Sequence, residues 1–329
     1  MSAPALEVVE LSDYAPHIAC SPLVTVLFGQ RIALVLDSAA GDVAARGRAA
    51  AGVDGSAAGL VSGLEALLRA FDACVGRVPS LAAPLRGRVR VEVAFLPGAA
   101  GLAHHGVAGI AVGPAFVEQC LGLYAAGRPT LHHVFCYEFC RNYIFPEEFT
   151  AVFDYCCLEG AASWGWVNQG FINVLGALLV ADMPGVAFDY HGFTLEQFLG
   201  QMEADLAAYR DGGHAWDAAF LHDRLPWAAG RSLDNLYSGL LVYLWRRFGR
   251  GVFLRRWFRG AIPLLLARCP ASKADVATAR DNFFLAASYA ARADLTPLFR
   301  DALRWPIGAD VAAHALEFVL DAARADPTA

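Results

Sequence analysis

LHHVFCYEFCRN, residues 131–142, is the stretch at which the chain changes from one kind of pattern to another. Ahead of it, Val alternates with Arg and Glu in Arg86–Phe95 (RGRVRVEVAF), which is typical of a strand with one side in solvent. Behind it, apolar residues recur every three or four positions, which is typical of helices. This order predicts an α+β fold and not the repeated βα alternation of a doubly wound sheet.

The same patterns place the individual elements. We expect strands at 22–28, 32–36, 86–95 and 107–112, with a loop at 97–106. Helices are expected at 60–75, 131–143, 164–179, 195–210, 233–248, 252–268, 273–292 and 310–323. Pro263 should kink or split the helix at 252–268. The chain then divides into a mixed α/β N-terminal lobe (1–130), a set of site helices (131–230) and a helical C-terminal lobe (231–329).

The composition excludes several classes of protein. With 329 residues, 57% of them hydrophobic and 18% charged, the chain can form a large core, and disorder is not expected. A net charge of −6 argues against nucleic-acid binding. The sequence holds no run of about 20 apolar residues, so we expect a soluble protein without a membrane span. The first residues hold no basic side chain, so no secretory signal is indicated, and we expect a cytoplasmic protein whose eight cysteines are mostly buried thiols.

The helix predicted at 131–143 carries many polar side chains for so apolar a chain. His133, Tyr137 and Arg141 follow one another at intervals of four residues and share one face, with Glu138 beside them. Such groups face a ligand, a partner or water, or they satisfy one another inside the protein. An internal ion pair between Glu138 and Arg141 is the simplest form of the second alternative.

Two further groups near this helix have a functional and a structural interpretation. His132, Cys136 and Cys140, together with Cys156 or Cys157, would supply four zinc ligands of suitable softness. Their spacing on one helix differs from the turn-based C-x2-C of structural zinc sites, so core cysteines are the simpler interpretation. His104 and His105, in the predicted loop, either face the site or are solvated.

Three segments resemble one known family, the aminopeptidase-type zinc metallopeptidases called gluzincins. Trp166–Ile172 (WVNQGFI) is similar to their W-x-N-E-G-F-A segment, and Tyr137–Arg141 (YEFCR) stands where they have H-E-x-x-H. Tyr237–Leu244 (YSGLLVYL) is similar to their Y-x-K-G-A helix, and the strand at 107–112 stands in the place of their substrate-binding edge strand. The resemblance implies a thermolysin-like fold, with a mixed α/β N-terminal lobe that ends in an antiparallel edge strand and an all-helical C-terminal lobe.

The departures from the family concern the metal. At the three positions of the family's zinc ligands this chain has Tyr137, Arg141 and Gln169, and only Glu138, the family's general base, is retained. A zinc site needs neutral His or anionic ligands, and the guanidinium of Arg is permanently cationic. Glu159 is a spare candidate for the third ligand. The sequence therefore predicts a protein with no bound metal and no cofactor.

Three functions are compatible with this pattern. In the first, the protein binds a peptide or a small molecule in the old active-site cleft without hydrolysing it. The residues expected at that ligand are Arg141, Gln169, His133, Asn168 and, on the strand, Gly109 and Ile110. The cleft would lie between this strand and the helices that bear Glu138, Gln169 and Tyr237.

The second function is a metal-free enzyme of specialised metabolism that performs an isomerisation, a cyclisation or a hydrolysis. Here Glu138 is the acid or base, assisted by Tyr137 and Tyr237, and Arg141 holds an anionic group of the substrate. We expect the charge of Arg141 to lower the pKa of Glu138 and to keep it ionised. The third function is an active zinc peptidase. The oligomeric state is left open.

Overall fold

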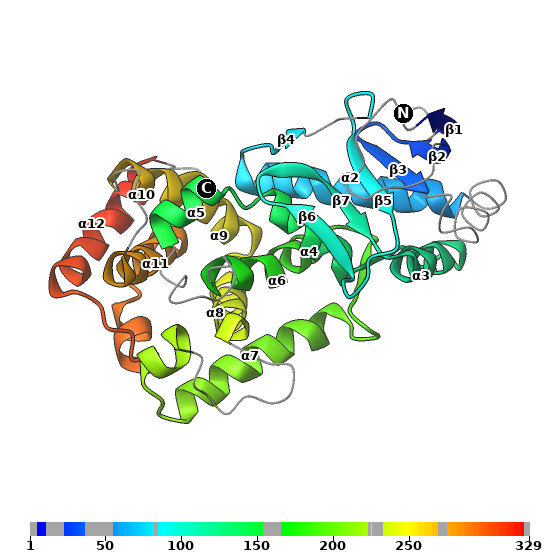
Figure 1. Ribbon diagram of the computed structural model, residues 1–329. Coiled ribbons are helices and arrows are strands. Elements are labelled where there is room, and N and C mark those ends of the chain that lie inside the picture. Colours follow the sequence, from blue (N-terminus) through cyan, green and yellow to red (C-terminus); the bar gives the residue numbers. More distant parts are fainter. Residues whose placement is uncertain are drawn as a thin grey trace. The chain divides into compact units, whose positions relative to one another are not determined.

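The computed structural model describes residues 5–10, 23–36, 55–81, 85–153, 166–222, 225, 233–268 and 275–325. The chain forms two compact units. Unit 1 comprises Met1–Asp72, Arg77–Ile144 and Leu175–Leu195, and unit 2 comprises Ala73–Gly76, Phe145–Val174 and Glu196–Ala329. Figure 1 shows strands and helices in unit 1, and helices in unit 2. The α+β class expected from the sequence is confirmed.

Unit 1 is built on a mixed seven-stranded sheet. Its strands are β1 (Ala5–Glu10), β2 (Leu23–Phe28), β3 (Ile32–Leu36), β4 (Ser80–Leu81), β5 (Val89–Val93), β6 (Gly101–His104) and β7 (Val107–Val112). The order is β1-β2-β3-β5-β7-β4, with β6 paired to the other side of β7. β1, β2 and β3 pair antiparallel, β3, β5 and β7 pair parallel, and β6 is antiparallel to β7. A short parallel pair, β8 (Thr130–His132) with β9 (Ala187–Asp189), completes the strands described in this unit.

Three helices of unit 1 accompany the sheet, namely α2 (Ser56–Val75), α3 (Pro114–Ala125) and α4 (His133–Asn142). α4 packs against β6 and β7 (Figure 1). α2 is joined to the β2–β3 turn by Glu65, whose carboxylate accepts hydrogen bonds from the backbone N–H groups of Arg31 and Ile32 at 2.8 and 3.4 Å. The helix that carries Glu138 therefore belongs to the sheet unit, and it lies against its last strand.

The edge strand is β6, and this corrects the sequence analysis in two respects. Residues 97–106 were expected to be a loop, but Gly101–His104 form a strand. The strand at 107–112 was expected to be the edge, but β7 lies between β5 and β6. β6 has only four residues and no β-branched side chain, so it gives no period-two signal. Its pairing with β7 is what makes it a strand.

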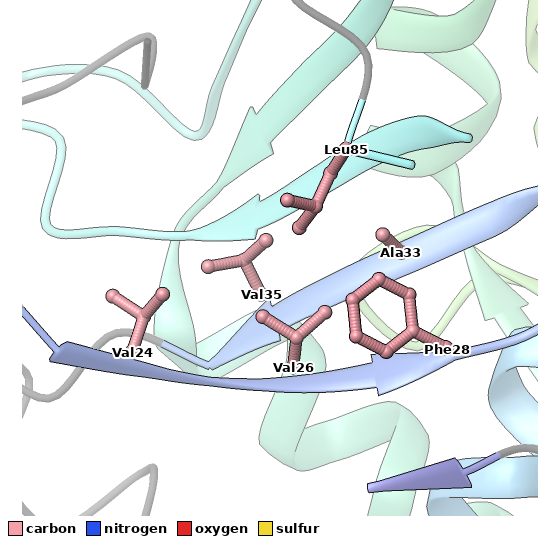
Figure 2. Close-up of a cluster of buried hydrophobic side chains, with 6 residues drawn as sticks. All are labelled: Val24, Val26, Phe28, Ala33, Val35 and Leu85. Atoms are coloured by element: carbon pink, nitrogen blue, oxygen red, sulfur yellow. The ribbon is translucent and has the colours of Figure 1, made fainter. Parts of the chain in front are cut away.

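One face of the sheet carries a compact apolar cluster. Figure 2 shows its members, which come from β2, β3 and the segment before β5: Val24, Val26, Phe28, Ala33, Val35 and Leu85. In the parallel register Ala33 lies opposite Arg90 and Val35 opposite Glu92, so these two charged residues of β5 point to the same face. Both are about 5% exposed and form an ion pair at 2.6 Å. The expectation that β5 has a solvent-facing side is therefore wrong.

The regular elements described in unit 2 are all helices. Its helices are α5 (Pro146–Phe153), α7 (Leu195–Asp211), α8 (Leu233–Arg247), α9 (Gly251–Arg256), α10 (Ile262–Arg268), α11 (Val276–Ala291) and α12 (Ala309–Ala325). Helix α6 (Trp166–Val180) belongs to this unit up to Val174 and to unit 1 from Leu175. The helix expected at 252–268 is divided just before Pro263, where a π-helical turn at Trp257–Ala261 connects α9 to α10. Proline has no N–H for the preceding turn, and such a wider turn accommodates that loss. None of the helices in the described residues is long and apolar enough to cross a membrane.

Glycine permits a close helix crossing in unit 1. A Cβ added to Gly176 of α6 would lie 2.6 Å from both the Cβ and the carbonyl oxygen of Cys136 in α4. Real Cβ atoms do not approach a backbone so closely, so any side chain at Gly176 would push the helices apart. Helix α4 therefore packs against α6 on one side, at Cys136, and against β6 on another.

We predict that Gly176→Ala lowers the free energy of unfolding by about 1 to 3 kcal/mol, since the clash is with fixed backbone and not with a movable side-chain end. Gly200, in α7, is the matched control: a Cβ there meets no atom within 4 Å. Gly200→Ala should raise the free energy of unfolding by about 0.5 to 1 kcal/mol through helix propensity alone. Urea unfolding of both variants measures this, and equal effects of the two changes would contradict the crossing.

Candidate functional site

Helix α4 begins with a side-chain cap. Nδ1 of His132 accepts a hydrogen bond from the backbone N–H of Val134 at 3.1 Å, which satisfies one of the free donors of the first turn. Because Nδ1 accepts, the ring proton of the neutral imidazole is on Nε2, 3.8 Å from Oδ2 of Asp189. Burial lowers the pKa of His132 to about 4, although Asp189 opposes this shift. His132 thus starts the helix as a neutral side chain.

One face of α4 carries a column of side chains that contact one another. The ring of His133 lies 5.8 Å from that of Tyr137, and the guanidinium carbon of Arg141 lies 5.2 Å above the Tyr137 ring. At the N-terminal end of the helix, the ring of His133 also contacts the rings of Tyr190, at 4.9 Å, and Phe188, at 5.8 Å. The shared face expected from the four-residue spacing is confirmed. His133 is buried in this aromatic group, and Arg141 stands at its more open end.

Glu138 is buried between its own helix and the edge strand. Only 3% of the residue is exposed, and its Oε2 lies 3.5 Å from Nη1 of Arg141, which donates a long hydrogen bond. The expected pair of Glu138 with Arg141 is therefore present. On its other side the carboxyl group meets Gly101 of β6, where an added Cβ would lie 2.7 Å from Oε1. The absence of a side chain at Gly101 leaves the space that the carboxyl group fills.

Burial dominates the charge state of this carboxyl group. It raises the pKa of Glu138 from 4.5 to about 7, while the charge and the hydrogen bond of Arg141 lower it to a smaller extent. The expectation that Arg141 lowers this pKa below its ordinary value and holds Glu138 ionised is wrong. Desolvation outweighs one ion pair at 3.5 Å. Near neutral pH, Glu138 is divided between its acid and its carboxylate.

The β6–β7 hairpin brings two histidines to this end of α4. Burial lowers the pKa of His105 to about 4, and the positive charges of Arg141 and His104 lower it further. His105 is therefore near Arg141 and not simply solvated, whereas His104 is exposed. Sequence reasoning left the position of both histidines open, because it expected a loop here.

Asn142, at the end of α4, is a residue that sequence reasoning missed. Its Oδ1 accepts from the N–H of Gly109 at 3.0 Å, and its Nδ2 donates to the carbonyls of Gly109 and His104 at 3.1 and 3.0 Å. The side chain thus joins both strands of the hairpin where their register shifts. Gly109 has a φ of 129°, which favours glycine. The only signal in the sequence was a polar Asn directly after Arg141, at the end of the predicted helix.

The two strand residues expected at the ligand, Gly109 and Ile110, are not available to one. The peptide group of Gly109 is bonded to Asn142 on both its N–H and its C=O. Ile110 is fully buried and lies opposite Val91 of β5 and Ala103 of β6. Since β7 has a strand on either side, a ligand backbone cannot pair with it. These two assignments are wrong, and the edge position belongs to β6.

Gln169 and Tyr237 belong to unit 2. Gln169 is half-buried and donates to Asn173 at 3.4 Å, and Asn173 donates to Asp234 at 2.5 Å. Tyr237 is fully buried, and its hydroxyl donates to the carbonyl of Phe220 at 3.2 Å. Burial also raises its pKa well above the ordinary value. A phenol in this position cannot reach a substrate, so the catalytic assignment of Tyr237 is wrong. The side chain of Asn168 lies outside the described residues.

The quoted segments of α6 and α8 touch one another in unit 2. A Cβ at Gly170 would lie 2.5 Å from Cβ of Tyr237, and the hydroxyl of Ser238 donates to the carbonyl of Gly170 at 3.1 Å. The glycine of the WVNQGFI segment therefore allows the helix with Tyr237 to pack directly against it. In this arrangement, the side chain of Tyr237 fills space in the core of unit 2.

The side chains around Glu138 do not fit a zinc ion. Arg141, at one of the family's ligand positions, is cationic and holds its guanidinium against Tyr137, the residue at the other position on α4. In the described part of the chain, no group of three or more His, Cys, Asp and Glu side chains is arranged to hold a metal. Cys136 and Cys140 are buried, and burial raises the pKa of Cys136. Cys156, Cys157 and Glu159 lie outside the described residues.

Comparison with known proteins adds no relative: no family model, no curated protein and no solved structure matches this chain.

We predict that Glu138→Gln stabilises the protein most at high pH. The acid form is preferred in the folded state, so the wild type loses stability as the pH rises from 4.5 to about 7, while the unfolded chain gives up its proton earlier. For so buried a group this amounts to about 2 to 3 kcal/mol between pH 5 and pH 8, and Gln has no proton to lose. Urea unfolding at the two pH values measures the difference between variant and wild type.

Glu317→Gln, an exposed change on α12, is the control and should show no such pH dependence. A difference between Glu138→Gln and wild type that is the same at pH 5 and at pH 8 would contradict the burial of this carboxyl group.

Proposed function

We propose that this chain is a gluzincin-like protein without a zinc site, which binds a peptide or a small molecule beside strand β6. The observation that carries the proposal is the position of β6. It is an antiparallel edge strand that pairs with β7 and with no other described strand, and it lies against the helix that bears Glu138 and Arg141. The resemblance implies a ligand-binding edge strand beside the helix with Glu138, and in this proposal β6 has that part in place of the strand first expected.

An edge strand offers a backbone surface to an extended ligand. Alternate residues of such a strand point their N–H and C=O groups away from the neighbouring strand, where they can pair with a peptide. Arg141, which is partly exposed, is close to this strand through Glu138 and can hold an anionic group of the ligand. The contact of the WVNQGFI segment with the helix of Tyr237 also supports the gluzincin-like fold.

A metal-free enzyme is the second candidate. It is favoured by the pKa of Glu138, about 7, since a general acid or base works best when its pKa is near the working pH. Arg141 would then orient an anionic substrate, and Tyr137 would keep Arg141 in place by stacking. Tyr237 takes no part in this version.

The test uses a pentapeptide of alternating threonine and valine, capped by acetyl and amide groups so that it carries no charge. We predict that it binds, and that of two analogues, N-methylated on the odd or on the even residues, only one loses binding, because alternate N–H groups pair with β6. Calorimetry measures the affinities, with the zinc content determined in the same sample. Treatment with a chelator should leave the affinity unchanged.

Gly101→Ala should weaken this binding because the new methyl group collides with Glu138 under β6, whereas Gly122→Ala, which meets no atom within 4 Å, should not. Equal binding of both methylated analogues, or one zinc per chain that binding requires, would contradict the proposal. If the mass of the peptide changes on incubation and Glu138→Gln abolishes this change, the second candidate function, a metal-free enzyme, is favoured over the binding protein.

A further inference from the structure

Glu138 and Arg141 form a loose pair in a tight space. The carboxyl group is almost completely enclosed, and its contact with the guanidinium, at 3.5 Å, is at the long limit of a hydrogen bond. A buried carboxylate needs that contact, because removing a charge from water without a partner is costly. A buried carboxylic acid does not need it. The guanidinium is therefore required by Glu138 in one protonation state only.

Any anion that approaches Arg141 competes with the carboxylate and not with the acid. The side chain of Arg141 is 15% exposed, while that of Glu138 is 4% exposed, so Arg141 is the more accessible partner of the pair. A planar guanidinium binds an oxyanion through two N–H groups, which a contact at 3.5 Å cannot match. An oxyanion from solvent is thus able to take the guanidinium from Glu138.

We propose that Arg141 is a proton-linked site for an oxyanion: the anion binds the guanidinium, and the released carboxylate of Glu138 takes up a proton from solvent. The balance is one anion and one proton bound for one ion pair opened, so a singly charged anion leaves the charge of the enclosed site unchanged and a doubly charged one makes it more negative by one unit. This inference rests on the role of Arg141 in the proposed function and names the way in which that site is regulated.

Several titratable groups surround Glu138, and the Glu138→Gln variant is what separates its proton from those of the neighbouring histidines. The elements packed against α4 include β6, β7, β8 and the Leu175–Val180 part of α6. The titratable groups that they and the hairpin turn contribute are His104, His105 and His132, and α4 itself adds His133 and Tyr137. Burial holds the pKa of His105 and that of His132 at about 4, so neither changes charge between pH 6 and 8. The pKa of Glu138, about 7, lies within this range.

The test uses inorganic sulfate, whose charge does not change between pH 6 and 8. We expect calorimetry to give an affinity about tenfold higher at pH 6 than at pH 8 and, at pH 8, an uptake of close to one proton per sulfate, measured from two buffers of different ionisation enthalpy. Glu138→Gln should bind sulfate equally at both pH values and take up no proton. Arg141→Gln should not bind, with its folding checked by circular dichroism.

Arg141→Lys, which keeps the charge but loses the planar guanidinium, is the alternative variant if Arg141→Gln does not fold. We expect it to bind sulfate more weakly than the wild type, with the same uptake of protons. The proposal is overturned if wild type does not bind sulfate, if Arg141→Gln binds as well as wild type, or if the pH dependence persists in Glu138→Gln. Because the capped peptide carries no anion and sulfate cannot pair with β6, failure of one experiment is distinguishable from failure of the other.

Discussion

The site depends on one contact, between the carboxyl group of Glu138 and a glycine of the edge strand, Gly101. Glu138 fits against Gly101, where any Cβ would lie within 3 Å of its side-chain atoms, and this fit removes the carboxyl group from water. Burial then sets the pKa, and the neighbouring Arg141 is too far away to reverse the shift. The chemistry available at this site therefore follows from how closely helix and strand approach.

That approach is held by polar side chains as much as by the core. His132 caps the first turn of α4, and Asn142 at its other end bonds both strands of the β6–β7 hairpin. Behind the helix, Gly176 lets α6 pack directly on Cys136. The helix is thus fixed at its start, at its end and along its back. Asn142 is bonded through both its oxygen and its nitrogen, and a buried polar group satisfied in this way restricts a structure to one arrangement, which is what a preorganised site requires.

Much of the fold was predictable from local patterns. The helical periodicity after residue 131 gave α6, α7, α8, α11 and α12 to within a few residues, because each helix satisfies its own backbone and shows its buried face in the spacing. The contacts of His133 with Tyr137 and of Tyr137 with Arg141, and the pair of Arg141 with Glu138, were predictable for the same reason. All of these contacts are made within one helix.

The errors concern residues whose environment depends on distant segments. β6 is a strand because β7 lies beside it, and nothing in its four residues indicates this. Arg90 and Glu92 alternate with valine as solvent-facing residues do, yet they are buried as an ion pair. Tyr237 matches a motif in sequence and was expected at the site, yet its side chain is buried in the core of unit 2. The direction of the pKa shift of Glu138 was missed because spacing shows a neighbouring charge but does not show how much water the fold excludes.

The central claim is that Glu138 is a buried carboxyl group that gains a proton near neutral pH. The most direct measurement is the titration of its side-chain carboxyl carbon by NMR in protein labelled with ¹³C-glutamate, with the signal assigned by its loss in Glu138→Gln. The account predicts a midpoint at about pH 7. A midpoint at or below the ordinary value of 4.5 would show that Glu138 is solvated or held ionised by Arg141, and would contradict the account.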